Sequence, residues 1–203
     1  MADKKKVGIL GGTFNPIHFG HLILAQNAYE EYELDKVLFI PTGISHFKDQ
    51  NIVLDKKVRC DMTRLAIEDN ECFELSTIEI ERPGNSYTCD TILQLKETDP
   101  DCEYYLIVGA DTVFMMEKWM NPQLIFDNAI ILASVRDDNG TDELRKKAEE
   151  LRNRYNADIR ILHSPMIDIS STTIREKVNA HKSVKYLLPD KVIAYIEKNG
   201  LYL

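Results

Sequence analysis

The chain has 203 residues, of which 44% are hydrophobic, and a formal net charge of −8. This length predicts one domain with a buried core, and the acidic balance argues against sequence-independent binding of nucleic acid. No stretch approaches the roughly 20 apolar residues of a membrane span, and the basic start at residues 1–6 is followed by too few apolar residues for a signal peptide.

The four cysteines are widely spaced, with no Cys-x-x-Cys pair: Cys60, Cys72, Cys89 and Cys102. This spacing predicts neither a zinc site nor a disulfide framework. Without a secretory signal, we expect free thiols in a reducing cytosol, and therefore a cytoplasmic protein with no membrane partner.

Strand-like and helical patterns alternate along the first half of the chain. Buried strands are predicted from short apolar runs, and helices from apolar residues that recur every three or four positions. In chain order the predicted elements are a strand at 7–10, a helix at 18–32, a strand at 37–40, a polar segment at 44–54, a helix at 55–69, an extended segment at 73–81 with a bend near Ser76, and a helix at 88–96.

The second half continues this alternation. In chain order it contains strands at 104–108 and 129–133, a charged helix at 141–155, a strand at 159–162, and helices that begin near 171 and 190, the last with Asn199-Gly200 as its C-cap. Strands separated by helices predict an α/β fold, a doubly wound parallel sheet of about six strands. We expect a single domain over 1–203, with a small helical C-terminal portion at 165–203. Such sheets bind ligands at the carboxyl ends of their strands, near a topological switch point.

The most informative segment joins the first predicted strand to the first predicted helix, and it reads GGTFNPIHFGH over residues 11–21. The glycine pair predicts a turn with close backbone approach, and a helix start offers N–H groups and a positive dipole end to an anion. His18 and His21 are three residues apart, on one helix face. The segment predicts a phosphate cradle beside two imidazoles. The alternative is a tight turn with ordinary polar histidines.

A second segment opens the helix near residue 171 and reads ISSTTIR over residues 169–175. Hydroxyl groups at a helix start cap backbone N–H groups and can also reach phosphate oxygens. Arg175 follows about one turn later and can add a bidentate grip on a phosphate. The alternative is a plain N-cap followed by a surface arginine.

Together the two segments resemble the signature motifs of the (T/H)xGH nucleotidylyltransferases, and the form with GGTF, a proline and HxGH most resembles the bacterial nicotinate-nucleotide adenylyltransferases. The resemblance spans essentially the whole chain. It implies that His18, His21 and Arg175 are the catalytic residues. The ATP-binding residues that it implies are Gly11, Gly12, Thr13, Phe14, His18, His21, Gly109, Asp111, Ile169, Ser171, Thr172 and Arg175.

Looser matches imply a binding site for a mononucleotide. VGAD at 108–111, followed by Trp119, resembles the segment that lines the family's cleft, where the indole would stack on a pyridine ring. GNSYTCDT at 84–91 resembles the family's GxSYTxDT, which implies that Thr88 lies beside the nicotinate carboxylate. Locally, Ser86 or Thr88 is also expected to cap the following helix.

Three further positions carry weaker resemblance. Lys48 follows Ser45-His46-Phe47, whereas relatives usually show Pro-His-Lys, so its alternatives are a phosphate contact and a solvated loop lysine. Arg136 resembles a basic position that lines the cleft in relatives, and its alternative is likewise a solvated side chain. Asn15 stands where many members carry Asp, and it is assigned with these residues to the mononucleotide site.

The implied reaction transfers the adenylyl group of ATP to nicotinate mononucleotide, giving nicotinate adenine dinucleotide and pyrophosphate, in NAD biosynthesis. The implied mechanism is direct in-line attack without a covalent enzyme intermediate, with Mg2+ carried by the nucleotide and no metal site on the protein. The substrates are then ATP and nicotinate mononucleotide, with no nucleic-acid partner. The sequence leaves the oligomeric state open, with a homo-oligomer among the alternatives.

Several rival functions are open at this point. Nicotinamide mononucleotide or phosphopantetheine could replace the nicotinate acceptor. His18 and His21 could be a metal-binding pair in a hydrolase, although no HExxH spacing or third ligand is evident. A third rival is a nucleotide-sensing module without catalysis, which the presence of both histidines and Arg175 argues against.

Overall fold

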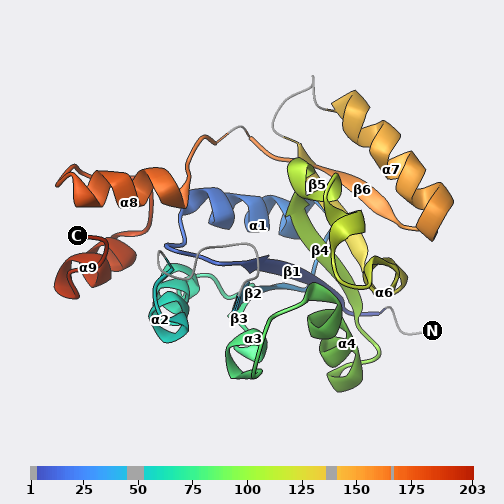
Figure 1. Cartoon of the computed structure of the whole chain (residues 1–203), viewed down its shortest axis with the longest axis horizontal. Helices are drawn as coiled ribbons and strands as arrows, with labels where there is room; N and C mark the ends of the chain where they lie inside the picture. Colours follow the sequence, from blue (N-terminus) through green and yellow to red (C-terminus); the bar gives the residue numbers. More distant parts are fainter. Residues whose placement is uncertain (1–3, 45–52, 136–140, 166) are drawn as a thin grey trace.

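A six-stranded, all-parallel sheet forms the centre of the molecule (Figure 1). The computed structural model describes residues 4–44, 53–135, 141–165 and 167–203. The sheet order is β3-β2-β1-β4-β5-β6. Strands β2 and β3 are added on one side of β1 and strands β4 to β6 on the other, so the order of winding reverses between β1 and β4. The strands are β1 (Lys6–Gly12), β2 (Lys36–Pro41), β3 (Phe73–Leu75), β4 (Glu103–Gly109), β5 (Ile130–Val135) and β6 (Ile159–His163).

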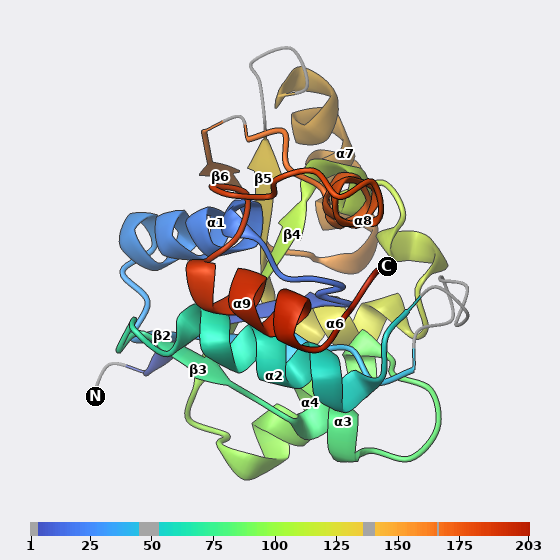
Figure 2. The same ribbon diagram turned by 90° about the vertical axis from the view of Figure 1, so that its left-hand side faces the viewer.

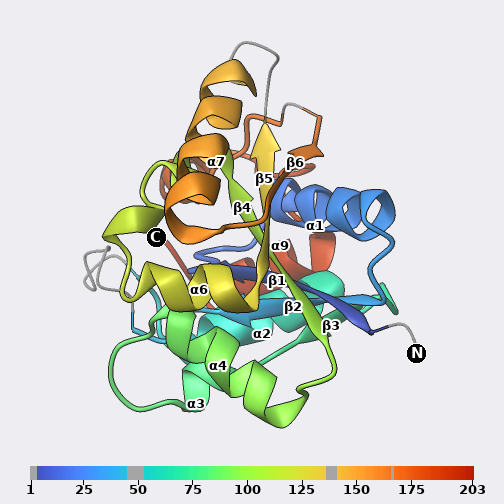
Figure 3. The same ribbon diagram turned by 90° about the vertical axis from the view of Figure 1, so that its right-hand side faces the viewer.

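Helices cover both faces of this sheet (Figure 3). One face packs against α1, α2, α8 and α9, and the other against α4, α6 and α7. This arrangement confirms the predicted doubly wound α/β fold. The helices are α1 (Phe19–Glu31), α2 (Lys56–Ile67), α3 (Ile78–Glu81), α4 (Thr88–Thr98), α5 (Ala110–Val113), the 3-10 turn η1 (Met116–Lys118), α6 (Pro122–Asn128), α7 (Thr141–Tyr155), α8 (Ser171–Asn179) and α9 (Asp190–Lys198).

The strands carry near-continuous apolar runs because both of their faces are buried. In β1, Val7 and Ile9 pack into the core on the α4 side, whereas Leu10 packs into the core on the α1 side. This alternation is the two-residue period of a strand. Among the described residues, no helix is both long enough and apolar enough to cross a membrane.

The prediction that residues 73–81 are extended is wrong beyond Leu75. The edge strand β3 pairs with only Val37–Phe39 of β2, and the chain then turns into the short helix α3. Ser76 N–H donates to the carbonyl of Phe39 at 2.9 Å, and Ile78 turns inward to pack against the core. Pairing and packing, rather than local strand propensity, decide this segment.

Sequence patterns also missed α6, which opens with Pro122 directly after Asn121 in the left-handed conformation (φ 45°). An Asn-Pro pair is typical of turns, but proline also suits the first position of a helix because its missing N–H has no partner to lose there.

The C-terminal helices pack onto the same core as the first motif (Figure 2). Ile174 of α8 and Val192 of α9 belong to the apolar cluster that contains Leu10 and Phe14. Gly200 is left-handed (φ 57°) directly after the C-cap Asn199, as expected for a helix end. Residues 11–18 and 171–202 are therefore close in space despite their separation in sequence.

Candidate active site

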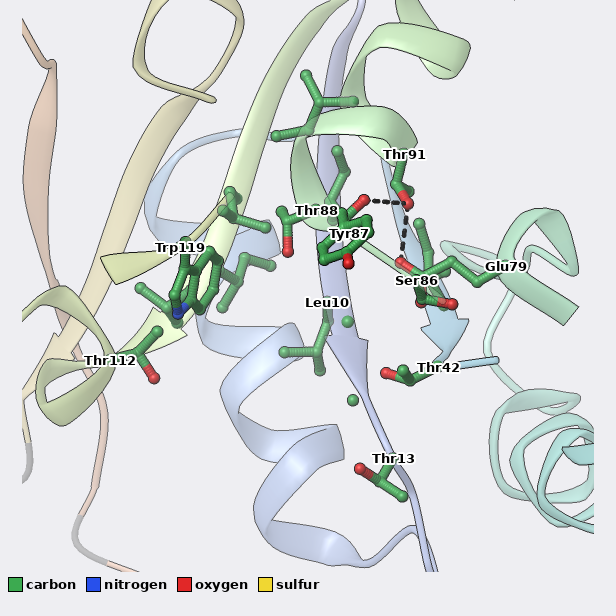
Figure 4. A pocket seen from close by; sticks show the side chains of 18 of the residues that line it. Leu10, Thr13, Thr42, Glu79, Ser86, Tyr87, Thr88, Thr91, Thr112 and Trp119 are labelled. Carbon is green, nitrogen blue, oxygen red and sulfur yellow. Dashed lines mark hydrogen bonds between the residues drawn. The ribbon is translucent and has the colours of Figure 1, made fainter. Parts of the chain in front are cut away.

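A cleft of about 740 Å³ opens at the carboxyl ends of β1 and β4, where the sheet order reverses (Figure 4). This volume and location are typical of a ligand site in a doubly wound fold. Its floor is formed by apolar strand residues such as Leu10 and Val108. Seven of the residues implied by the resemblance line it: Gly11, Gly12, Thr13, His21, Thr88, Gly109 and Trp119.

The glycine pair lies in β1 rather than in a turn, which corrects the sequence-based prediction. Gly11 and Gly12 pair with Ile40 and Pro41 of β2, and the chain turns only at Asn15 and Pro16, after the left-handed Phe14 (φ 47°). A Cβ on Gly12 would lie 2.8 Å from the Phe14 ring, so the glycine lets that ring fold back against the strand. A Cβ on Gly11 would meet nothing within 4 Å, and this position leaves the backbone open to a ligand.

His21 lies at the edge of the cleft with a defined tautomer. Its Nδ1 accepts a hydrogen bond from the backbone N–H of His18 at 3.3 Å. An accepting ring nitrogen carries no proton, so the neutral ring carries its proton on Nε2 and is a donor there. The ring of Phe14 braces the imidazole edge-on, with centroids 5.0 Å apart. The site thus offers an oriented N–H donor.

His18 is the N-cap residue of α1, and its ring packs against that of His21 with centroids 3.8 Å apart. Only 6% of His18 is exposed, and its Nδ1 is buried without a partner in the structure. A Cβ on Gly20 would lie 3.0 Å from this Nδ1, so Gly20 makes room for the ring. Burial lowers the pKa of His18 to about 4, so the imidazole is neutral at physiological pH.

We expect this buried imidazole to make the protein less stable as the pH falls. The folded state holds the proton of His18 with a pKa of about 4, against 6.5 for the ordinary side chain. The unfolded chain therefore binds more protons between these values, and the free energy of unfolding falls by up to about 3 kcal/mol as the pH is lowered through that window.

Urea denaturation at about pH 7.5 and about pH 5 measures this effect. The wild type is expected to lose more stability between the two conditions than a His18→Gln variant, whose side chain does not titrate. Equal losses in the two proteins would contradict the assignment.

The C-terminal motif meets the first motif at the backbone of residues 15 and 16. Ser171 Oγ donates to the carbonyl of Pro16 at 2.8 Å, and Arg175 donates from Nη1 to the carbonyl of Asn15 at 2.9 Å. Ser170 is the N-cap of α8, and its Oγ accepts from the N–H of Thr173 at 3.1 Å. Residues about 155 apart in the chain thus form one local structure.

Trp119 and Thr88 also line the cleft. Figure 4 shows the Trp119 indole on one side of the cleft and Thr42, Ser86 and Glu79 on the other, with Thr88 between them. The expected N-cap at Ser86 or Thr88 is wrong: the N-cap of α4 is Tyr87, with no side-chain cap. The N–H of Thr91 donates to the carbonyl of Tyr87 at 3.2 Å, which leaves the Thr91 hydroxyl for another acceptor.

The remaining predicted residues do not line this cleft. The side chains of Phe14 and Asn15 are buried beside it, Asp111 is exposed in the first turn of α5, and Thr172 is exposed on α8 with its Oγ1 3.3 Å from Arg175 Nη2. Lys48 and Arg136 lie outside the described residues. Ile169 is partly buried, and its carbonyl lies 3.8 Å from where a Cβ on Gly20 would be.

Arg59 is a buried residue beside the cleft that the sequence analysis missed. It is 2% exposed, and its guanidinium donates to four backbone carbonyls at 2.6–3.1 Å, those of Thr13, Thr42, Gly43 and Leu54. It therefore joins the chain after β1, the chain after β2 and the segment before α2. Its position in the helical period could have indicated that it is buried. Arg59 precedes Met62 by three residues and Ala66 by seven, so it lies on the buried face of α2.

Glu79 is a second missed residue. It lines the cleft, is 8% exposed, and accepts a hydrogen bond from Thr91 Oγ1 at 2.8 Å. Burial raises the pKa of this carboxyl, while nearby donors, including the hydroxyl of Thr91, oppose that rise. A Cβ on Gly43 would lie 2.3 Å from the backbone carbonyl oxygen of Glu79, so only glycine fits at position 43. No sequence pattern distinguished Glu79 from a surface carboxylate.

The sequence is similar to known proteins over most of its length. Residues 9–177 match the cytidylyltransferase-like family. The chain is 44% identical over 199 residues to a probable nicotinate-nucleotide adenylyltransferase of Lachnoclostridium phytofermentans, covering 98% of this chain and 100% of that one. It is 41% identical to the probable enzyme of the same name from Desulfitobacterium hafniense strain Y51, covering 99% and 97%.

Among solved structures, the fold is similar to Plasmodium falciparum nicotinic acid mononucleotide adenylyltransferase complexed with NaAD, with a TM-score of 0.78 at 18% identity, covering 98% of this chain and 97% of that one. The protein is therefore an enzyme of the nucleotidylyltransferase class, with the cytidylyltransferase-like fold. Within that class, the chain belongs to the nicotinate-nucleotide adenylyltransferase family.

Proposed function

We infer that this chain transfers the adenylyl group of ATP to nicotinate mononucleotide, releasing pyrophosphate and forming nicotinate adenine dinucleotide. The main support for this proposal is that two kinds of binding group line the same cleft. The exposed backbone at Gly11 and the His21 donor lie in the same cavity as Trp119 and Thr88. The first pair suits phosphate oxygens, and the second suits a flat aromatic ring with a polar substituent. The full-length relatives named for this reaction support the same conclusion.

The proposed chemistry is a single in-line displacement. A phosphate oxygen of the mononucleotide forms a bond to the α-phosphorus of ATP, while the bond from that phosphorus to the β-phosphate oxygen breaks. A phosphate monoester is largely ionised at neutral pH, so no general base is required. The protein then contributes positioning and charge stabilisation. His21 donates to the reacting phosphates, and His18 supports its ring. The departing pyrophosphate is assigned to Ser171, Thr172 and Arg175 on α8, which lie next to the first motif but outside the lining of the cleft.

We propose that Mg2+ enters with ATP. Bound to phosphate oxygens and water, it would neutralise part of the triphosphate charge. Over the described ranges, no group of three or more His, Cys, Asp and Glu side chains could hold a metal ion.

A comparison of acceptors tests the proposed function. The purified protein is incubated with ATP and, separately, nicotinate mononucleotide, nicotinamide mononucleotide or phosphopantetheine, and pyrophosphate release is measured. We expect kcat/KM for the acid to exceed that for the amide by at least about tenfold, because a neutral carboxamide leaves donors beside Thr88 poorly satisfied. A variant with both motif histidines changed to alanine controls for contaminating enzyme. Preference for the amide, or for phosphopantetheine, would overturn the substrate assignment.

A further inference from the structure

The last residues of the chain reach the first motif. Tyr202 Oη donates a hydrogen bond to Asn15 Oδ1 at 2.9 Å, across 187 residues of sequence. The tail makes this approach through two left-handed residues, Gly200 (φ 57°) and Tyr202 itself (φ 65°). A non-glycine residue seldom adopts that conformation, and it persists where surrounding contacts require it. The Tyr202 ring also packs against the apolar cluster that contains Phe14.

Within the part of the chain that the structure describes, Asn15 is held from three separate parts of the fold. Its Oδ1 also accepts from the N–H of Leu54 at 3.3 Å, and its carbonyl accepts from Arg175 Nη1 at 2.9 Å. The residue is 4% exposed, so these contacts replace water. The tail, the segment before α2, and α8 therefore all meet at one residue of the first motif.

The phenol of Tyr202 remains a donor across the physiological pH range. Burial raises its pKa, and the nearby positive charges of Arg175 and Arg59 only partly oppose this. A neutral phenol beside two arginines can satisfy an amide oxygen without competing for the guanidinium groups. Tyr202 is therefore the donor and Asn15 the acceptor of this hydrogen bond throughout the physiological pH range.

This contact lies three residues before His18, whose backbone N–H sets the tautomer of His21. The intervening Pro16 is held by Ser171, so the path from Tyr202 to the histidines consists of bonded or hydrogen-bonded groups. We propose that Tyr202 is a positioning residue of the active site, which completes the binding loop from the C-terminal end of the chain through Asn15. This inference rests on the proposed adenylyl transfer for its kinetic readout.

A Tyr202→Phe variant removes only the hydroxyl. We expect kcat to fall roughly five- to tenfold, the effect of losing one buried hydrogen bond, with KM for ATP changed by less than about twofold. The matched control is Tyr195→Phe, because Tyr195 lies on α9 and donates instead to Asp61 at 3.3 Å. This control is expected to leave kcat unchanged. In an Asn15→Ala background, Tyr202→Phe is expected to have no further effect on kcat.

Hydrogen exchange supplies a readout that does not depend on turnover. Amides of residues 13–21 are expected to exchange faster in Tyr202→Phe than in Tyr195→Phe. Equal kcat values and equal exchange in these two variants would overturn the inference, as would a full additional loss of kcat in the Asn15→Ala background. If the wild type does not adenylylate nicotinate mononucleotide, the proposed function fails, while the exchange comparison still decides the role of Tyr202.

Discussion

Changing His21 to alanine is expected to lower kcat by roughly 10²–10³-fold, the usual effect of removing one preorganised donor to a developing negative charge. The structure gives the reason: the ring has a defined tautomer, with Nδ1 accepting from the backbone of His18, and lies at the edge of the cleft. We expect His18→Ala to act over a similar range, because its buried ring packs on that of His21 with centroids 3.8 Å apart. Steady-state kinetics with ATP and nicotinate mononucleotide measure both effects.

The two histidines are expected to behave as a unit. The double variant should lose less than the product of the two single effects, since removing one ring already misplaces the other. His181→Ala is the matched control, because His181 is exposed and lies outside the cleft. A double variant that keeps kcat within about tenfold of the wild type would contradict the role assigned to the imidazoles.

The largest loss of stability is expected at Arg59. An Arg59→Met variant keeps much of the side-chain volume but removes every donor, leaving partly or fully buried carbonyls after β1 and β2 without this partner. The expected decrease in the free energy of unfolding is about 3–5 kcal/mol, because each buried, unpaired carbonyl carries a desolvation cost. For a chain of this length, such a loss lowers Tm by roughly 6–20 °C. Urea and thermal denaturation measure it.

Two variants make this test specific. Arg59→Lys retains one charged donor group, and we expect it to recover part of the lost stability, since an ammonium cannot reach every carbonyl that the planar guanidinium reaches. Arg64→Met is the matched control on the same helix, because Arg64 is exposed and pairs only with Asp61 among the described ion pairs. Its expected effect is below about 1 kcal/mol. Loss of less than about 1 kcal/mol in Arg59→Met would show that the carbonyls find other partners.

Local patterns predicted most elements because periodicity is a property of neighbouring residues. The strand at 104–108 and the helix at 141–155 lie within β4 and α7 as the structure has them. The prediction of an extended segment at 73–81 failed, because the short edge strand is followed by a helix whose Ile78 packs inward. The predicted glycine turn failed for a related reason: strand pairing with β2 extends through Gly12, and no local signal indicates where pairing stops.

The sequence by itself determined the fold class and the family, because the two motifs and the strand–helix alternation are written in consecutive residues. Only the tertiary structure decided what holds the first motif in place. Arg59, Arg175 and Tyr202 contact residues 13–15 from 46, 160 and 187 positions away, respectively. Such contacts depend on the strand order and on how α8 and α9 pack, which no local period encodes. The structure also explains the glycine of the HxGH motif. Because Gly20 has no side chain, the buried imidazole of His18 has room to pack against it.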